Sequence, residues 1–278
     1  MAARCTRRCT FFYLLHLSAS RYTILMPDYF SSVAPIVEEA GVALAKGFGK
    51  AEAAAFKADH HHSAVTEFDR KTEQFLAEHL GKLFPDIKFF GEEFGGDNSA
   101  ERFWLVDPID GTSNFIRGLP FATTMVTLIQ DGAPFFSLIY NFISKEMYSA
   151  EKGKGARLNG SPIRVSTRPL QYAYIFAETN RRDHKNAEIS SRINEKFNVY
   201  ATRNSGFEYA QVARGGIEAR ITFGDPPGED WDYAPGALLV AEAGGVVRNL
   251  GCDTYDYRNH EFVAGNREAC DALEKLLS

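Results

Sequence analysis

Cysteine is scarce in this sequence, which has four in 278 residues. Cys5 and Cys9 lie near the N-terminus, and Cys252 and Cys270 lie near the C-terminus. This distribution provides neither the framework of a small disulfide-stapled domain nor the paired spacing of a zinc site. It suits a reducing compartment, and we expect a cytoplasmic protein.

Long apolar runs and an excess of positive charge are also missing. The run FFYLL at residues 11–15 is much too short to cross a bilayer. Because 31 basic residues face 36 acidic ones, the net charge is -5, and a surface that binds nucleic acid is not expected. There is no internal repeat. What the chain does have is 45% hydrophobic residues, enough for a sizeable core.

Residues 1–25 differ in composition from the rest of the chain. They contain Arg4, Arg7, Arg8 and Arg21 and no acidic residue. Such a leader is typical of a targeting peptide. Met26 equally suits a true start, in which case residues 1–25 are a translated upstream extension. Both interpretations stay open, and the leader is left out of the fold prediction.

The remaining chain alternates between helical and strand patterns. Helical spacing predicts helices at 29–48 and, from the Thr66 cap, to residue 83, followed by strands at 87–91, 103–106, 122–129, 135–142 and 146–150. After the Asn159-Gly160 turn, strands are expected at 163–166, 172–178, 219–223 and 245–248, and helices at 187–197, 207–214 and 231–243. This order predicts an α/β protein with helices layered on sheets. We expect two lobes, 26–160 and 161–278.

Acidic residues gather where the predicted strands and helices end. The stretch WLVDPIDGTSNF at 104–115 places Asp107 at the end of a strand that Pro108 is expected to stop, with Asp110 beyond it. Two further acidic stretches are FFGEEFG at 89–95 and EDWD at 229–232. Each alone has an ordinary explanation as a turn, a solvated loop or a helix cap. Together, without matching basic residues, they would repel one another unless cations neutralised them. Carboxylate oxygens favour magnesium over zinc.

The three stretches together resemble motifs of the inositol monophosphatase family, over about residues 29 to 270. They are GEE at 91–93, WLVDPIDGTSNF at 104–115, and WDYAPG at 231–236 with EAGG at 242–245. The resemblance implies a layered αβαβα sandwich, a homodimer, and magnesium-dependent, lithium-sensitive hydrolysis of small phosphate monoesters without a membrane or nucleic-acid partner.

Site residues follow from the resemblance position by position. Two magnesium ions are implied, one held by Glu92, Asp107 and the Ile109 carbonyl and one by Asp107, Asp110 and Asp232, with Asp107 between them. Gly111 and Thr112 resemble the phosphate-binding turn. Asp69 and Thr112 resemble the pair that orients the attacking water, and with Glu92 they form the implied catalytic set. The alternative for Asp69 is a capping box with Thr66.

Further residues are expected around this centre. Glu93 is expected in the outer shell or at a third, weaker ion, and Lys57 on a loop near the metals. Residues 60–62 are three consecutive histidines, which do not easily converge on one ion, so a solvated loop is favoured.

Substrate selection is where this chain departs from the family. Many relatives have GSA or GTA where this chain has NSGFE at 204–208. The substrate is expected to face Asp110, Gly206, Glu208 and an acid of the 225–230 loop, either Asp225 or Glu229. Inositol-1-phosphate is the expected substrate. The alternatives are histidinol phosphate, fructose 1,6-bisphosphate, 3'-phosphoadenosine 5'-phosphate and, without catalysis, binding to the transcription machinery.

Overall fold

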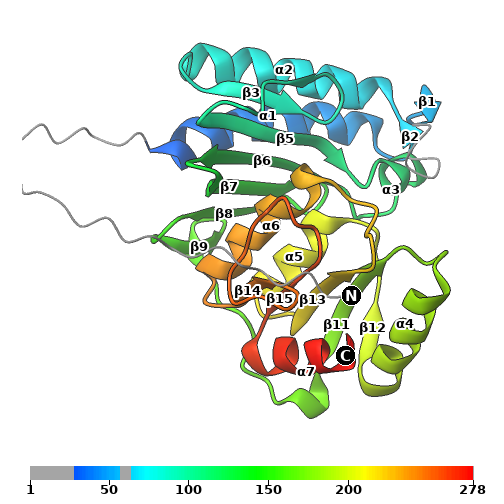
Figure 1. Ribbon diagram of the computed structural model, residues 1–278. Coiled ribbons are helices and arrows are strands. Elements are labelled where there is room, and N and C mark those ends of the chain that lie inside the picture. Colours follow the sequence, from blue (N-terminus) through cyan, green and yellow to red (C-terminus); the bar gives the residue numbers. More distant parts are fainter. Residues whose placement is uncertain (1–27, 57–63, 278) are drawn as a thin grey trace, which may run out of the picture.

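Two β-sheets and three layers of helices form the protein, as seen in a computed structural model that describes residues 28–56 and 64–277 (Figure 1). From one side of the molecule to the other, the order is α1 and α2, the larger sheet, α5 and α6, the smaller sheet, then α4 and α7. This is the αβαβα sandwich expected from the sequence.

The larger sheet has eight strands in the order β10-β9-β8-β7-β6-β5-β3-β4. Its strands are β3 (Lys88–Gly91), β4 (Gly95–Gly96), β5 (Arg102–Asp110), β6 (Thr123–Gln130), β7 (Ala133–Asn141), β8 (Glu146–Glu151), β9 (Gly155–Leu158) and β10 (Ser161–Pro162). Helices α1 (Tyr29–Gly47) and α2 (Glu67–Leu83) cover its outer face, and the short α3 (Thr112–Arg117) follows β5. A separate pair is formed by β1 (Ala55–Phe56) and β2 (Ala64–Val65).

The smaller sheet has five strands in the order β12-β11-β13-β15-β14. They are β11 (Tyr174–Thr179), β12 (Asn198–Tyr200), β13 (Ala219–Phe223), β14 (Val246–Asn249) and β15 (Phe262–Gly265), and a 3-10 turn at Leu170–Tyr172 precedes β11. Its outer face carries α4 (His184–Lys196) and α7 (Arg267–Leu277), while α5 (Ser205–Ala213) and α6 (Asp230–Glu242) lie between the sheets.

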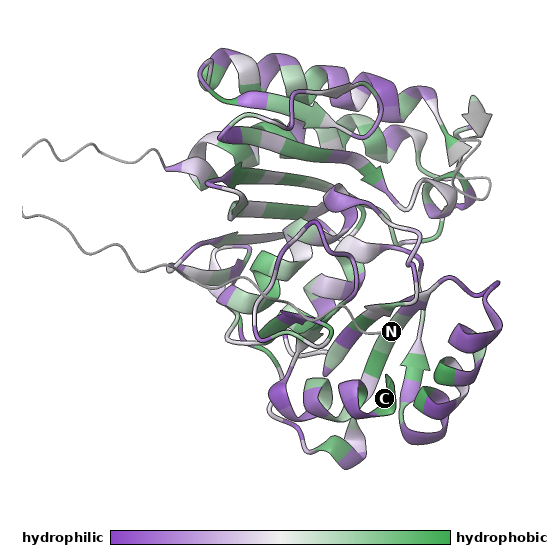
Figure 2. Ribbon diagram, viewed as in Figure 1, coloured by the Kyte–Doolittle hydropathy of each residue, from purple (hydrophilic) through white to green (hydrophobic). Residues whose placement is uncertain are grey.

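Four apolar clusters lie among the described residues: a small one joins Phe103 and Leu105 of β5 to Ala234 of α6, and three larger ones match the layers. One lies under α1 and α2 around Trp104, one lies between the two sheets around Tyr209, and one lies under α4 and α7 around Ile221. Figure 2 shows apolar residues running along the strands, with polar residues on the outer sides of the helices. The central core contains side chains from both sheets, and a boundary near Gly160 stays a prediction.

Strand β5 corrects the expectation that Pro108 ends the strand. It continues to Asp110 through a register shift, since Asp107 pairs with Met125 and Asp110 with Thr123. On its other side, the pairing of β5 with β3 ends at Val106. Pro108 therefore lies in a bulge. Its missing N–H interrupts no hydrogen bonding with β3, because that pairing has already ended. The bulge lets both aspartates leave one strand close together.

The prediction of a strand at 163–166 was wrong, because these residues do not pair with any of the described strands. Ile163 and Val165 instead pack against the central core, which explains the alternating pattern. Strands β1, β2, β4, β9, β10, β12 and β15 and helix α7 were not predicted. The strands have only two to four residues, too few for a clear alternation. Helix α7 does show helical spacing, with Ala269, Cys270, Ala272 and Leu273 on its buried side, so its pattern would have allowed the prediction.

Candidate active site

Asp107, Asp110 and Asp232 meet where β5 ends and α6 begins. One carboxylate oxygen from each lies within 4.8 Å of the others. Asp107 and Asp110 are 2% and 6% exposed, so these charges are largely removed from water. Asp232 is the third residue of α6 and accepts a hydrogen bond from the Glu229 N–H at 2.7 Å, so it caps the helix and also joins the cluster.

Nothing positively charged compensates these three acids among the residues that the structure describes: none forms an ion pair there. Burial raises the pKa of Asp107 and of Asp232 well above the usual value, and repulsion from Glu92 and from Asp110 adds to this in both cases. Burial raises the pKa of Asp110 to about 7, against the lowering effect of its hydrogen bond from Gly206. Among the residues that the structure describes, Oδ1 of Asp107 is buried and has no hydrogen-bond partner. A buried, unpartnered carboxylate oxygen beside two other acids is the donor set that Mg²⁺ prefers.

Glu92 follows β3 directly, and its N–H donates to the Val106 carbonyl at 3.1 Å. The loop that carries it is held by Glu73 of α2, whose carboxylate accepts from the N–H of Glu93 at 2.7 Å and of Phe94 at 2.9 Å. A Cβ at Gly91 would lie 2.3 Å from that carboxylate, so only glycine permits the approach. Burial raises the pKa of Glu73 to about 7. Sequence patterns did not single out Glu73, because its partners are about twenty residues away.

Asp69 forms a capping box and also contacts Thr112, and its part in catalysis stays a prediction. Its Oδ2 accepts from the N–H and hydroxyl of Thr66 at 2.7 and 2.6 Å, which completes the capping box of α2. Its Oδ1 lies 2.9 Å from the hydroxyl of Thr112, which is also 3.0 Å from the Ile109 carbonyl oxygen. The single hydroxyl hydrogen serves one of these acceptors at a time. Burial raises the pKa of Asp69 to about 6.

The start of α5 is fastened to the end of β5. The Gly206 N–H donates to Asp110 Oδ2 at 2.6 Å, and the Asn204 side chain donates to the Asp110 carbonyl at 2.6 Å. A Cβ at Gly206 would lie 2.4 Å from the Thr123 hydroxyl oxygen, so this position also requires glycine. At Gly111, φ is +79° and a Cβ would lie 2.7 Å from the Phe121 carbonyl oxygen. These contacts fix the turn that was expected to bind phosphate.

The other expected residues lie in different surroundings. Both carboxylate oxygens of Glu208 are used inside the protein, so its geometry gives the expected substrate contact no support. Asp225 is exposed on the loop after β13, where its N–H donates to Glu261 at 3.1 Å. Glu93 is half-buried beside the acids and raises the pKa of Asp69 by charge repulsion. Lys57 and the histidines 60–62 lie outside the described residues.

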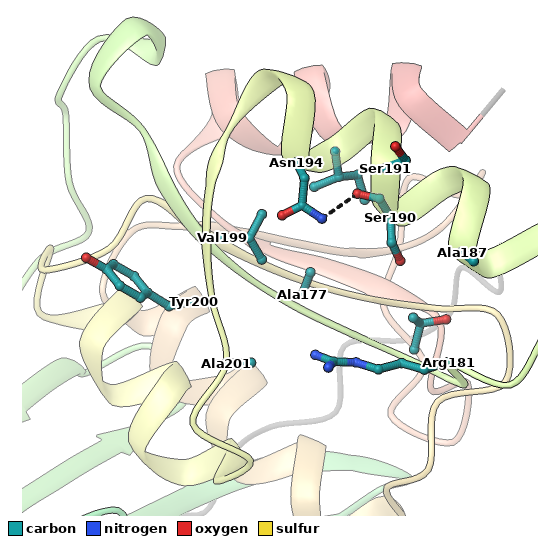
Figure 3. Close-up of a pocket in the computed structure, with 11 residues that line it drawn as sticks. Ala177, Arg181, Ala187, Ser190, Ser191, Asn194, Val199, Tyr200 and Ala201 are labelled. Carbon is teal, nitrogen blue, oxygen red and sulfur yellow. Dashed lines mark hydrogen bonds between the residues drawn. The ribbon is translucent and has the colours of Figure 1, made fainter.

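A cavity of about 510 Å³ lies elsewhere, between α4 and the strands β11 and β12 (Figure 3). Ser190 and Asn194 of α4 line it together with Arg181 and Val199. None of the clustered acids lines it, so its size does not mark the place of the acid chemistry.

Comparison with known proteins agrees with this geometry. Residues 29–277 match the profile of the Inositol monophosphatase family. The chain belongs to that family. Inositol monophosphatase 3 of Solanum lycopersicum is 36% identical over 228 residues, which are 77% of this chain and 84% of that protein. Membership places the chain among the inositol monophosphatase-like phosphoric monoester hydrolases.

Solved structures of the family share the fold. The extragenic suppressor protein SuhB of Bartonella henselae superposes with a TM-score of 0.82 at 26% identity, over 91% of this chain and 99% of that one. An IMPase/NADP phosphatase solved with Mg²⁺ and phosphate has a TM-score of 0.75 at 20% identity, over 88% of this chain and 92% of its own.

Among the described residues of the present chain, no helix is both long and apolar enough to span a membrane.

Proposed function

We propose that this protein is a magnesium-dependent phosphatase that hydrolyses a small phosphate monoester, with inositol-1-phosphate as its substrate. The observation that carries the proposal is the buried, uncompensated cluster of Asp107, Asp110 and Asp232 beside the Thr112–Asp69 hydrogen bond. Family membership and the relatives named inositol monophosphatase support it.

In this proposal Glu92, Asp107, the Ile109 carbonyl, Asp110 and Asp232 hold two Mg²⁺ ions. Bound Mg²⁺ supplies Lewis-acid polarisation of the phosphoryl group. The protein's own part is to keep five oxygen ligands close together, with no ion pair to Asp107, Asp110 or Asp232 among the described residues, so that an ion is needed to offset their repulsion. Glu93 completes the outer shell.

Phosphate and water are positioned by the turn after β5. In this proposal the backbone N–H groups of residues 111 and 112, at the start of α3, bind the phosphate of the substrate. Gly111 has no side chain, which allows the phosphate to approach the backbone closely. The Thr112 hydroxyl accepts a hydrogen bond from the attacking water while it donates to Asp69. The proton that the water loses passes to the Thr112 hydroxyl as that hydroxyl gives its own proton to Asp69, so that Asp69 is the base in this proposal.

Two further properties rest on the resemblance alone: the protein is a homodimer, and lithium inhibits it. Sedimentation of the purified protein and phosphate release in millimolar LiCl test them independently.

Phosphate release from a panel of phosphomonoesters tests the proposed function. We expect turnover of inositol-1-phosphate with Mg²⁺ and none in excess EDTA, with activity restored when Mg²⁺ is returned. Undiminished turnover in EDTA would contradict the role of the acids, and turnover of histidinol phosphate or a bisphosphate alone would reassign the substrate.

A further inference from the structure

A second charged cluster lies between the two sheets, centred on Arg220 of β13. The Arg220 side chain is 1% exposed, and burying a guanidinium is costly unless it is fully paired. Its nitrogens donate to four side chains: Glu208 at 2.9 Å, Glu178 at 2.7 Å, the Tyr209 hydroxyl at 2.6 Å and the Ser205 hydroxyl at 3.1 Å. We call these five residues the Arg220 cluster.

The two carboxylates of the Arg220 cluster have different surroundings. The Glu208 side chain is 5% exposed, with Oε2 bound to Arg220 and Oε1 accepting from the N–H and hydroxyl of Thr202. The Glu178 side chain is 25% exposed, and its Oε2 accepts from Arg220 and from the Tyr233 hydroxyl at 3.0 Å. Oε1 of Glu178 receives no hydrogen bond from the residues that the structure describes. One acceptor atom of Glu178 is therefore available to a ligand.

Glu178 also lies beside the acids that hold the metal. Tyr233, which donates to it, follows Asp232 directly, and the Tyr233 hydroxyl accepts from the Gly228 N–H of the loop after β13 at 2.9 Å. Repulsion from Glu178 is among the causes that raise the pKa of Asp232. At the other end of the cluster, Ser205 precedes Gly206, the residue bonded to Asp110. The Arg220 cluster thus adjoins, through Ser205 and Glu178, the acids and the turn where phosphate is expected.

We propose that Glu178 binds the alcohol part of the substrate, with its free oxygen accepting a hydrogen bond from a hydroxyl group. This rests on the proposed function, since it names the substrate class of the same site. An ionised carboxylate only accepts, so the alcohol must carry a donor. Arg220 holds Glu178 in place through Oε2, which leaves the side chain little freedom to swing away.

The charge of the cluster narrows the substrate class further. One guanidinium faces two carboxylates, so one negative charge stays uncompensated, and Glu178 is the carboxylate nearer to solvent. A second phosphate on the alcohol would approach that charge and be repelled. The monophosphate of a neutral polyol, or of an alcohol with an amine, is favoured over a bisphosphate.

The experiment measures kcat/KM for inositol-1-phosphate, fructose 1,6-bisphosphate and p-nitrophenyl phosphate, whose leaving group has no further hydroxyl. Glu178→Gln keeps the size of the side chain but replaces an acceptor and its charge. The ratio of kcat/KM for inositol-1-phosphate to that for p-nitrophenyl phosphate should fall roughly tenfold or more, the loss expected for one hydrogen bond to a charged group. Relative activity on the bisphosphate should rise.

Glu146→Gln is the matched control, because Glu146 of β8 is also paired with an arginine, Arg214, and its side chain is 26% exposed, close to the 25% of Glu178, but it lies outside the Arg220 cluster. It should leave the ratio near that of the unmodified protein. Should Glu178→Gln not fold, Glu178→Asp keeps the charge, withdraws the carboxylate by one methylene and should also lower the ratio. An unchanged ratio in a folded Glu178 variant overturns the inference while the proposed function stands. Absence of Mg²⁺-dependent turnover in the unmodified protein overturns both.

Discussion

At the scale of single residues, Asp107 depends most on a cation. It is 2% exposed, Oδ1 has no hydrogen-bond partner in the described part of the chain, and its neighbours Glu92, Asp110 and Asp232 repel it. The protein thus keeps a charge where its own contacts do not stabilise it, which is typical of a site arranged for function rather than for stability.

Asp107→Asn should remove activity without removing the fold. An amide removes the repulsion, and its N–H₂ finds carboxylate acceptors nearby, so the melting temperature in EDTA should be equal or higher. Turnover with Mg²⁺ should fall on the order of a hundredfold or more, the size typical of one electrostatic group in an active site. Asp86→Asn, at an exposed acid of the same lobe, should change neither quantity. Loss of folded protein in Asp107→Asn would mean that Asp107 serves the structure.

Thr112→Ala should lower kcat and leave Mg²⁺ affinity nearly intact. The substitution removes the hydroxyl that lies 2.9 Å from Asp69 Oδ1, and one missing group of this kind typically costs on the order of a hundredfold. Thr112→Ser keeps the hydroxyl and should retain most of the activity. Equal kcat values for the alanine variant and the unmodified protein would take Thr112 out of the mechanism.

At the scale of elements, α2 supports the site from behind. Asp69 and Glu73 lie one turn apart on its buried side, and they hold Thr112 and the loop of Glu92 respectively. A rigid helix therefore fixes two parts of the site relative to each other, in the way that outer groups orient the ligands of a metal.

Glu73→Gln should weaken Mg²⁺ binding more than it lowers kcat. One carboxylate oxygen becomes an amide N–H₂, which faces a backbone N–H and breaks one of the two bonds to the loop. The Mg²⁺ dissociation constant, measured by calorimetry, should rise roughly tenfold or more, as for other groups behind metal ligands. Glu67→Gln, an exposed position of the same helix paired with Lys71, should leave it unchanged. Unaltered Mg²⁺ affinity in Glu73→Gln would show that the loop does not need this support.

The elements also show what local patterns predict and what they miss. Helix α2, its Thr66 cap, the acids after β3 and those at the end of β5 follow from short stretches of sequence, since periodicity and capping are local. Glu73 and Arg220 were missed because local patterns do not reach their partners, which lie about 20 residues away for Glu73 and 11 to 42 residues away for Arg220. For the same reason Glu208 was expected at the substrate: its charge was visible in the sequence, but its pairing with Arg220 was not.

At the scale of the whole molecule, the acid cluster exists only in the folded chain. Its members come from β5 and from the start of α6, more than a hundred residues apart in sequence. A cation that binds there favours the native state, and 100 times its dissociation constant would stabilise the fold by about 2.7 kcal/mol. Saturating Mg²⁺ should raise the melting temperature by several degrees over EDTA, and Asp107→Asn should lose most of that rise. An equal rise in the variant would place the ion elsewhere.

The stability of the metal-free protein should fall as pH rises. Burial raises the pKa of Asp69 to about 6 and those of Glu73 and Asp110 to about 7. Around pH 5 to 7 the folded chain therefore binds more protons than the unfolded chain, whose acids have lower pKa values. Stability linked to these groups is present below the unfolded pKa values and is lost as pH rises through about 7.

Mg²⁺ should reverse this dependence, because it binds the deprotonated carboxylates and competes with protons. We expect the melting temperature in EDTA to fall between pH 5.5 and pH 8, and the rise produced by Mg²⁺ to be larger at pH 8 than at pH 5.5. Calorimetric scans at pH 5.5 and at pH 8, each with and without Mg²⁺, measure these melting temperatures. Asp107→Asn removes one of the raised acids and should flatten the decline in EDTA. A melting temperature in EDTA that climbs over this interval, with the same effect of Mg²⁺ at both ends, would mean that other groups govern the stability of the fold.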